Sequence, residues 1–307
     1  MAGVIAIGEC MAELSLTGPE AGRGGAAAIG YAGDTYNTAV YLRRLGLEVA
    51  YASAVGAGDP FSAGILASLA EEGIGRDLVV EAEGRLPGLY AIQRDPAGER
   101  SFFFWRSEAP ARDYLKLADL AKLSAALNTA DLIVVSAISL AILGEAGRAT
   151  LTGLLAQAAA AGVAVAFDTN YRAPLWPGPD VGRAAIEAVL PHCRYLSLSA
   201  EDVTAFKGRS AEAMARTWAA RGLEVVLRHA DHRIEVLSGE GAELFPPEPA
   251  AETVVDTTGA GDSFNAGYWA TRLRDGSAAE GVAAGRRLAA AVVQHPGAII
   301  PRAAMPG

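Results

Sequence analysis

Cysteine and histidine are scarce in this chain. Its 307 residues include two cysteines, Cys10 and Cys193, and four histidines. Two cysteines imply neither a disulfide framework nor a metal cluster. His229 and His232 lie three residues apart but lack further partners at metal-ligand spacing, so the sequence predicts no metal site built from protein ligands.

An excess of positive charge is also lacking. Lys and Arg number 26 against 35 Asp and Glu, a net charge of −9, so no general basic field attracts nucleic acid or anionic lipid. An anionic substrate would need local basic residues. The apolar run Leu132–Leu143 is interrupted by serines and is too short for a membrane span. The segment 1–8 lacks the basic region of a signal peptide and resembles a strand. We therefore expect a cytoplasmic protein without a nucleic-acid or membrane partner.

Hydrophobic residues are abundant, at 51% of the chain, and they follow a regular order. From about residue 114, short apolar runs alternate with helical segments of 10–15 residues. This alternation predicts an α/β fold with a largely parallel sheet covered by helices on both faces. The length suits one large domain, and we expect residues 1–307 to form it. The expected strands of this region are 132–136, 163–168, 195–198 and 225–228.

Three more exposed strands do not fit that order. They lie near residues 10–17, 26–32 and 88–105, and the last contains a hairpin with a turn at 95–98. We interpret the segments at about 10–32 and 88–106 as a small β-sheet that projects from the main domain as a lid.

The most informative segment is Asp256–Gly267, which reads DTTGAGDSFNAG. Gly259, Ala260 and Gly261 leave backbone amides unshielded at a helix N-terminus, which favours a bound anion. Asp262 follows directly, and we interpret it as the base that accepts a proton from a hydroxyl attacking a phosphoryl group. The structural alternative is a capped helix after a glycine turn.

Two other glycine-containing junctions lead into helices. At the first, Gly33 allows close approach of a ligand, and Asp34 and Asn37 offer polar groups to the hydroxyls of a polyol. The structural alternative is an Asp cap followed by a partly buried Asn. The second junction, Val55–Gly64, lacks the Lys-Ser/Thr of a phosphate-binding loop, so we interpret Asp59 as a helix cap before Pro60.

Two arginines are candidates for binding a carboxylate. Arg106 ends the aromatic strand 100–105, and a guanidinium can clamp a carboxylate with two hydrogen bonds. Arg172 follows the strand 163–168 at its carboxyl end, where open α/β sheets bind ligands. Arg172 suits a substrate carboxylate or the transferring phosphate, and Asn170 suits nucleotide phosphates. The structural alternatives are a solvated arginine and a plain loop.

These motifs, in this order, resemble the ribokinase-like (PfkB) family of carbohydrate kinases. The signature at 256–264 is highly specific, and the resemblance covers essentially the whole chain. Within the family the chain is most similar to bacterial 2-keto-3-deoxygluconate kinases. The segments that carry this closer similarity are 7–14, 85–90, 98–106, 138–143, 170–176 and 297–302.

The resemblance implies a ribokinase-like three-layer αβα sandwich and a set of residue roles. It implies that Asp262 deprotonates the terminal hydroxyl of 2-dehydro-3-deoxy-D-gluconate, and that ATP with Mg²⁺ supplies the phosphoryl group, giving the 6-phosphate and ADP. The implied anion hole is Gly259, Ala260 and Gly261. The implied sugar-acid site is Gly33, Asp34, Asn37, Tyr90, Phe104, Arg106 and Arg172, and the implied ATP site is Asn170, Arg172, Arg228, Ala230 and residues 259–261.

The chain departs from the family pattern after the strand 225–228. Relatives usually carry Lys-Arg-Gly-Ala-x-Gly/Ser there, whereas this chain has Leu227–Arg233, with His229 and His232 at the two small-residue positions. The family's Asn-x-x-Glu near the metal is here Ser199–Asp202.

Three alternatives follow: a kinase for another sugar such as fructose or a pentose, a non-catalytic sugar sensor, and a lid that serves mainly as a subunit interface. We expect a homo-oligomer formed through the lid.

Overall fold

The computed structural model describes residues 3–16, 27–94, 100–204, 210–248 and 253–307. The turn expected at 95–98 and part of the expected lid, 17–26, lie outside these residues. None of the helices in the described part of the chain has the length and apolar character needed to span a membrane.

A nine-stranded sheet forms the centre of the molecule, in the order β13-β12-β11-β10-β9-β8-β1-β4-β5. Neighbouring strands from β11 to β5 pair in parallel, and β12 and β13 add an antiparallel edge. The strands are β1 (Val4–Ile7), β4 (Val49–Gly56), β5 (Gly75–Ala82), β8 (Leu132–Ser136), β9 (Ala164–Asp168), β10 (Tyr195–Ser199), β11 (Glu224–Arg228), β12 (Ile234–Ser238) and β13 (Gly241–Phe245).

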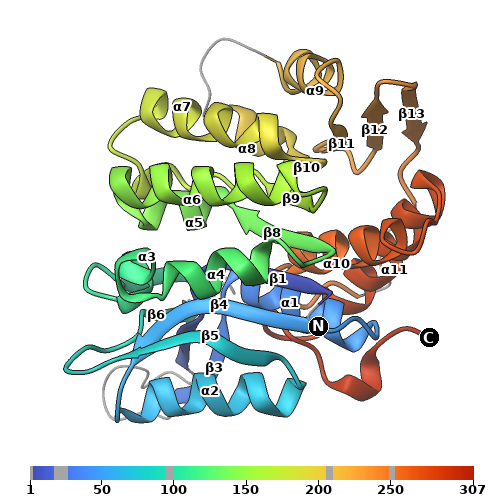
Figure 1. The fold of residues 1–307 in the computed structure, drawn as a ribbon. Coiled ribbons are helices and arrows are strands. Elements are labelled where there is room, and N and C mark those ends of the chain that lie inside the picture. The colour runs from blue at the N-terminus through green and yellow to red at the C-terminus, as the bar shows by residue number, and fades with distance from the viewer. Residues whose placement is uncertain (1–2, 17–26, 95–99, 205–209, 249–252) are drawn as a thin grey trace.

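Helices cover both faces of this sheet (Figure 1), because the strands are apolar on both sides. Along β1, Val4 and Ala6 face one helical layer, and Ile5 and Ile7 face the other. The first layer contains α1 (Asp34–Arg44), α2 (Pro60–Glu72), α10 (Ala260–Arg272) and α11 (Ala278–Val292). The second contains α3 (Tyr114–Leu117), α4 (Leu120–Leu127), α5 (Ala137–Ile142), α6 (Gly144–Ala160), α7 (Pro179–Val189), α8 (Ala200–Thr204) and α9 (Ala211–Ala219).

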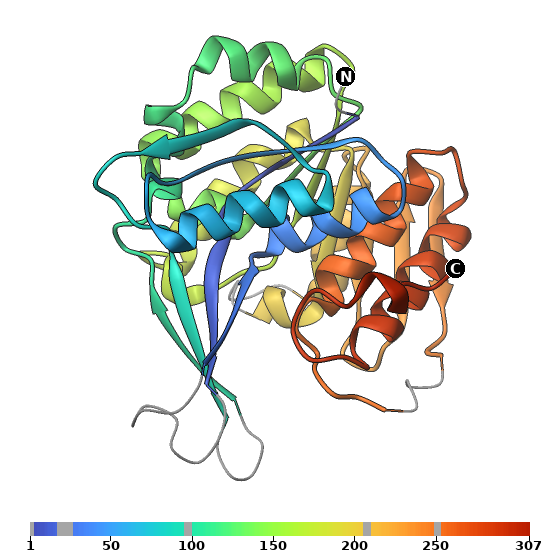
Figure 2. The same cartoon turned by 90° about the horizontal axis from the view of Figure 1, so that it is seen from below.

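A second, four-stranded sheet projects from this body (Figure 2). We call it the lid sheet. Its order is β3-β2-β6-β7, with β2 and β6 parallel and the two outer pairs antiparallel. The strands are β2 (Met11–Leu16), β3 (Ala27–Ala32), β6 (Leu89–Arg94) and β7 (Arg100–Trp105).

The predicted α/β architecture is therefore confirmed, as are the 89–94/100–105 hairpin and the cap at Asp59. The Asp59 carboxylate accepts hydrogen bonds from the amides of Phe61 and Ser62, and Pro60 is the first helical residue. Three strands of the large sheet, β5, β12 and β13, were not predicted.

Candidate active site

The N-terminus of α10 begins after a glycine, Gly259, in a left-handed conformation. Gly259 has φ 76°, and a Cβ there would lie 2.7 Å from the carbonyl oxygen of Ala298. The first intrahelical hydrogen bond runs from Ser263 N to Gly259 O, so the amides of Gly261 and Asp262 precede the helical ladder. The Ala260 amide donates to Thr257 O at 3.2 Å. The amides of Gly261 and Asp262 are therefore the better placed for an anion.

Two helix N-termini meet at Asp262. The Asn37 amide of α1 donates to Asp262 Oδ2 at 2.8 Å. Asp34, the first residue of α1, accepts a hydrogen bond from Asn170 Nδ2 at 3.1 Å. Four sequence-predicted residues from three distant segments, Asp34, Asn37, Asn170 and Asp262, are thus brought together at the carboxyl ends of the parallel strands.

A buried network lies behind this group. Asn265, one turn beyond Asp262 on α10, donates to Asp168 Oδ2 at 2.8 Å and accepts a hydrogen bond from Ser197 Oγ at 2.7 Å. Thr169 Oγ1 donates to Asp202 Oδ2 at 3.1 Å. The ends of β9 and β10 are therefore tied to α10 by polar side chains.

The carboxylates of the candidate site lie close enough together to raise one another's pKa values, in addition to the effect of burial. The pKa of Asp262 is raised well above its ordinary value, first by desolvation and then by the charge of Asp34, while the Asn37 hydrogen bond opposes the rise. The pKa of Asp168 is raised to about 6, mainly by burial, while Arg228 lowers it and Asp202 raises it. The site therefore favours a group that brings positive charge.

Arg228 supplies positive charge at the end of β11. Its Nη2 lies 3.6 Å from Asp168 Oδ1, and its guanidinium lies over the Phe264 ring, 5.8 Å from the centroid. A Cβ on Gly261 would lie 2.7 Å from Arg228 Nη1. Gly261 thus leaves room for this arginine beside the exposed amides of α10.

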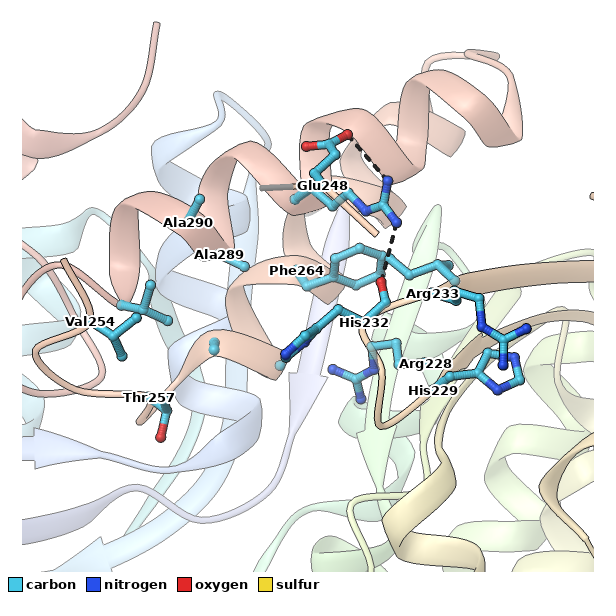
Figure 3. Close-up of a pocket in the computed structure, with 15 residues that line it drawn as sticks. Arg228, His229, His232, Arg233, Glu248, Val254, Thr257, Phe264, Ala289 and Ala290 are labelled. Atoms are coloured by element: carbon cyan, nitrogen blue, oxygen red, sulfur yellow. Dashed lines mark hydrogen bonds and ion pairs between the residues drawn. The ribbon is translucent and has the colours of Figure 1, made fainter. Parts of the chain in front are cut away.

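A cavity of about 410 Å³ opens beside Arg228 and Gly261 (Figure 3). Its lining includes Thr257, which precedes α10, and Ala260 and Phe264 of α10. It also includes Ala289 and Ala290 of α11 and Val293, which follows that helix. The β11–β12 turn contributes His229, His232 and Arg233. The cavity is thus largely apolar with a cationic, amide-lined end, which suits a planar ring that carries phosphate.

The sequence model of the pfkB family of carbohydrate kinases matches residues 1–305. The chain belongs to this family.

Individual relatives agree with that assignment. A 2-dehydro-3-deoxygluconokinase of Dickeya dadantii (strain 3937) is 42% identical, with 98% of this chain and 97% of the relative covered. A protein of the same name from Escherichia coli (strain K12) is 40% identical, with 99% and 98% covered. A crystal structure of a PfkB protein from Polaromonas sp. JS666 superimposes with a TM-score of 0.84 at 26% identity, covering 96% of each chain.

Residues of the lid sheet, and residues that follow β1 and β7, extend this candidate site. Arg106 Nη2 pairs with Glu9 Oε2, and only 10% and 2% of the two side chains are exposed. Burial raises the pKa of Glu9, and Arg106 opposes that rise. Tyr90 donates its hydroxyl to Glu13, and its ring stacks with Phe104 at 5.6 Å between centroids. Arg106 Nε and Glu9 Oε1 are buried without a hydrogen-bond partner in the described structure.

Two predicted residues lie apart from these contacts. Arg172 is exposed before the 3₁₀ turn Ala173–Leu175, and Ala230 is exposed in the β11–β12 turn without lining the cavity. No role was predicted from the sequence for Glu9, Asn265 or Phe264. The positions of the first two carried a signal: Glu9 follows the central strand at its carboxyl end, and Asn265 lies three residues after Asp262 on one helical face.

Proposed function

We propose that this protein is a sugar-acid kinase. It transfers the γ-phosphate of ATP to the 6-hydroxyl of 2-dehydro-3-deoxy-D-gluconate, giving 2-dehydro-3-deoxy-6-phosphogluconate and ADP. The observation that carries the proposal is the identity of about two fifths, over nearly the full length, with two proteins named for this reaction. The meeting of Asp262 with the N-termini of α1 and α10 supports it from the structure.

The proposed chemistry assigns the proton to Asp262. The sugar hydroxyl oxygen attacks the γ-phosphorus, the bond from that phosphorus to the oxygen of ADP breaks, and the hydroxyl proton passes to Asp262. A raised pKa suits such a base, because the carboxylate then holds the proton more strongly. The proposed anion hole at residues 259–261 and the Arg228 guanidinium stabilise the charge of the transferring phosphate. Within this segment the Gly261 amide, with the neighbouring Asp262 amide, is the better placed donor, because the Ala260 amide already donates to Thr257 O.

The sugar acid is proposed to lie between the α1 N-terminus and the lid sheet. Gly33 lets the start of α1 pack against the backbone between β1 and β2, since a Cβ there would lie 2.0 Å from Glu9 O; the sugar acid is proposed to lie beside it. Asp34 and Asn37 bind hydroxyls, and Tyr90 and Phe104 cover the carbon chain. Arg106 binds the carboxylate with donors that its pairing to Glu9 leaves available. Arg172 approaches from the loop after β9 and contacts the carboxylate or the phosphates.

ATP is proposed to occupy the cavity beside α10 and α11. Its base lies among the apolar side chains of α11, and its phosphates extend past Arg228 toward Gly261. Asn170 and Arg172 contact the phosphates from the loop after β9, and the backbone at Ala230 borders the nucleotide.

Mg²⁺ is proposed to accompany ATP. Among the described residues, no three or more His, Cys, Asp or Glu are grouped to hold a metal ion. This fits a cation that phosphates carry with one or two carboxylates and water. Asp168 and Asp202 are the carboxylates suited to it: the pKa of Asp168 is raised to about 6, first by burial and then by the charge of Asp202, and a cation would offset both effects. When bound, the ion neutralises charge on the nucleotide phosphates.

The protein is further proposed to be a single-domain enzyme that forms a homo-oligomer in the cytoplasm. The sheet runs without interruption from β13 to β5, which supports a single catalytic domain with the lid sheet as its extension. Ile29, Phe103 and Trp105 are 57%, 47% and 59% exposed on the lid sheet, which supports a homo-oligomer formed there. We place the enzyme in the cytoplasm.

ADP release with Mg-ATP, measured across sugar acids and neutral sugars, tests the function. Turnover is expected with 2-dehydro-3-deoxygluconate and not with fructose or ribose, because neutral sugars leave Arg106 without a carboxylate. Faster turnover with fructose or a pentose would show that the proposed acceptor is wrong and that the protein is a kinase for that sugar. Binding of the sugar acid without ADP release would indicate a non-catalytic sensor.

A further inference from the structure

The turn between β11 and β12 holds a non-glycine residue in a conformation that favours glycine. His232 has φ 65°, and Asp275 at 59° is its one counterpart among non-glycine residues in the described ranges. His229 N donates to Arg233 O at 2.9 Å, and His232 N donates to His229 O at 3.0 Å. These bonds define a three-residue hairpin loop whose last residue is left-handed. Glycine is the most common residue at such a position. Asparagine, aspartate and histidine are the other residues enriched there, and each carries some backbone strain.

Arg286 of α11 holds His232 in this conformation. Its Nη2 donates to the carbonyl oxygens of His232 at 3.3 Å and Pro246 at 2.7 Å. Its Nη1 pairs with Glu248 at 3.2 Å. The arginine therefore anchors two loops to α11, with the cavity between them and the helix (Figure 3). Strain persists where the surroundings over-determine a conformation in this way.

The strained residue directs its side chain to the cavity. Figure 3 shows the His232 ring extending toward the side of Thr257, whereas the His229 ring turns away from it. His229 lies instead between Glu212 and Glu235, at 3.7 and 3.6 Å. Both histidines border the cavity, but the His229 ring is held between two carboxylates, whereas the His232 ring extends along the cavity and can face a ligand there (Figure 3).

We propose that His232 is a specificity-determining residue of the nucleotide site, with its imidazole packed against the face of the purine base of ATP. This inference rests on the proposed function, which places ATP in the cavity. The α11 side of the cavity offers alkyl groups, Ala289, Ala290 and Val293, which contact a base without selecting its ring size. A flat aromatic ring gains more contact from a purine than from a pyrimidine. Stacking would offset the strain of the left-handed histidine.

His232→Asn tests the inference, because asparagine tolerates the left-handed conformation and lacks the ring. We expect the KM for ATP to rise about tenfold, with a smaller rise for CTP, and the KM for the sugar acid to stay unchanged. Asp275→Asn is the matched control: it also introduces asparagine at a left-handed position, in the α10–α11 turn and outside the cavity lining. Both KM values of this control should equal those of the wild type.

His232→Phe separates stacking from charge or hydrogen bonding. It keeps a flat ring, so its KM for ATP should stay within about threefold of the wild type. Wild-type ATP affinity in His232→Asn would overturn the inference, and so would an equal loss in the Asn and Phe variants. Thermal melting of all three variants shows whether a loss of ATP affinity comes from unfolding. If it does, His232 stabilises the fold and the proposed contact with the base is contradicted.

Calorimetric binding of ADP keeps this inference separable from the proposed function. If the wild type phosphorylates no sugar acid but His232→Asn still binds ADP about tenfold more weakly, the kinase proposal fails and the role of His232 stands. If the wild type is active and His232→Asn binds ADP normally, only the role of His232 fails.

Discussion

At the scale of single residues, the site concentrates negative charge where anionic ligands are proposed to bind. The pKa of Asp262 is raised first by burial and then by the charges of Asp34 and Asp168. The pKa of Asp168 is raised first by burial and then by the charge of Asp202. Arg228 opposes the rise at both Asp168 and Asp262. Holding these carboxylates close together costs electrostatic free energy when no ligand is bound. Cations that accompany the nucleotide reduce this repulsion. It also gives Asp262 a basicity that an exposed aspartate lacks.

Asp262→Asn should therefore lower kcat by at least ~10²-fold while sugar-acid binding persists, because asparagine keeps the shape but accepts no proton. Initial rates of ADP release and calorimetric binding measure the two effects. Asp59→Asn is the matched control, since Asp59 also lies at a glycine-containing helix start, where asparagine is an equally good cap. Near-wild-type turnover in Asp262→Asn would remove this residue from the chemistry.

Asp168 should make stability depend on pH. Its pKa is about 6 in the folded protein against an ordinary 3.8, so between these values the folded state binds a proton that the unfolded chain releases. Its contribution is fully present at low pH and is lost as pH rises through about 6. Relative to the wild type, Asp168→Asn should gain about 1 kcal/mol between pH 5 and pH 8. Urea unfolding at both pH values measures this, and an equal difference at both would contradict it.

Motifs in the sequence placed several polar groups of the candidate site at the ends of elements. Asp34, Asn37 and Asp262 all lie within the first turn of a helix. The structure joins Asn37 to Asp262, and Asp34 to Asn170. The pairing of Arg106 with Glu9 and the position of Arg228 over Phe264 could not be predicted, because they depend on side chains that meet only through tertiary packing.

At the scale of elements, the contact between α10 and α11 depends on glycine. A Cβ on Gly267 would lie 2.8 Å from Ala284 O, and one on Gly285 would lie 2.7 Å from Phe264 Cδ2. At these two positions the helices therefore approach too closely for a side-chain carbon on the glycine. Because Phe264 and Ala289 line the cavity from these helices, their spacing also sets its width.

Gly267→Ala should destabilise the protein by about 1–3 kcal/mol, because the added methyl group meets backbone atoms that can move only with the whole helix. Gly153→Ala in α6 is the control, since nothing lies within 4 Å of its added Cβ. There the loss of backbone freedom in the unfolded chain should stabilise the fold by about 0.5–1 kcal/mol. Denaturant unfolding of both variants measures the contrast, and similar free energies would refute the packing argument.

Elements were predicted well where periodicity was long and poorly at the sheet edges. The buried strands β8 to β11 alternate with helices, a pattern that the sequence shows directly. The edge strand β13 is exposed along most of its length, and β5 mixes charged with apolar residues. Their pairing is dictated by neighbouring strands, which a single-sequence pattern does not contain.

At the scale of the whole molecule, the lid sheet has two different faces. Met11, Tyr90 and Ile92 point toward the body and pack with Ala298. Because strand side chains alternate, Phe103 and Trp105 of β7 point the other way, and Ile29 of β3 shares that outer face. The same sheet can therefore cover a sugar acid with one face and a second subunit with the other.

Assembly through the outer face yields a last prediction. The wild type should form a dimer or larger oligomer in light scattering, and the double variant Phe103→Ser, Trp105→Ser should be a monomer, because the exposed apolar area that drives association is lost. ADP binding should survive in the variant, since the cavity is lined by other elements. Leu244→Ser on β13 is the control: this leucine is 55% exposed at the far edge of the large sheet, so its loss should leave the oligomer intact. A wild type that stays monomeric at every concentration, or a double variant that assembles normally, would place the subunit contact elsewhere.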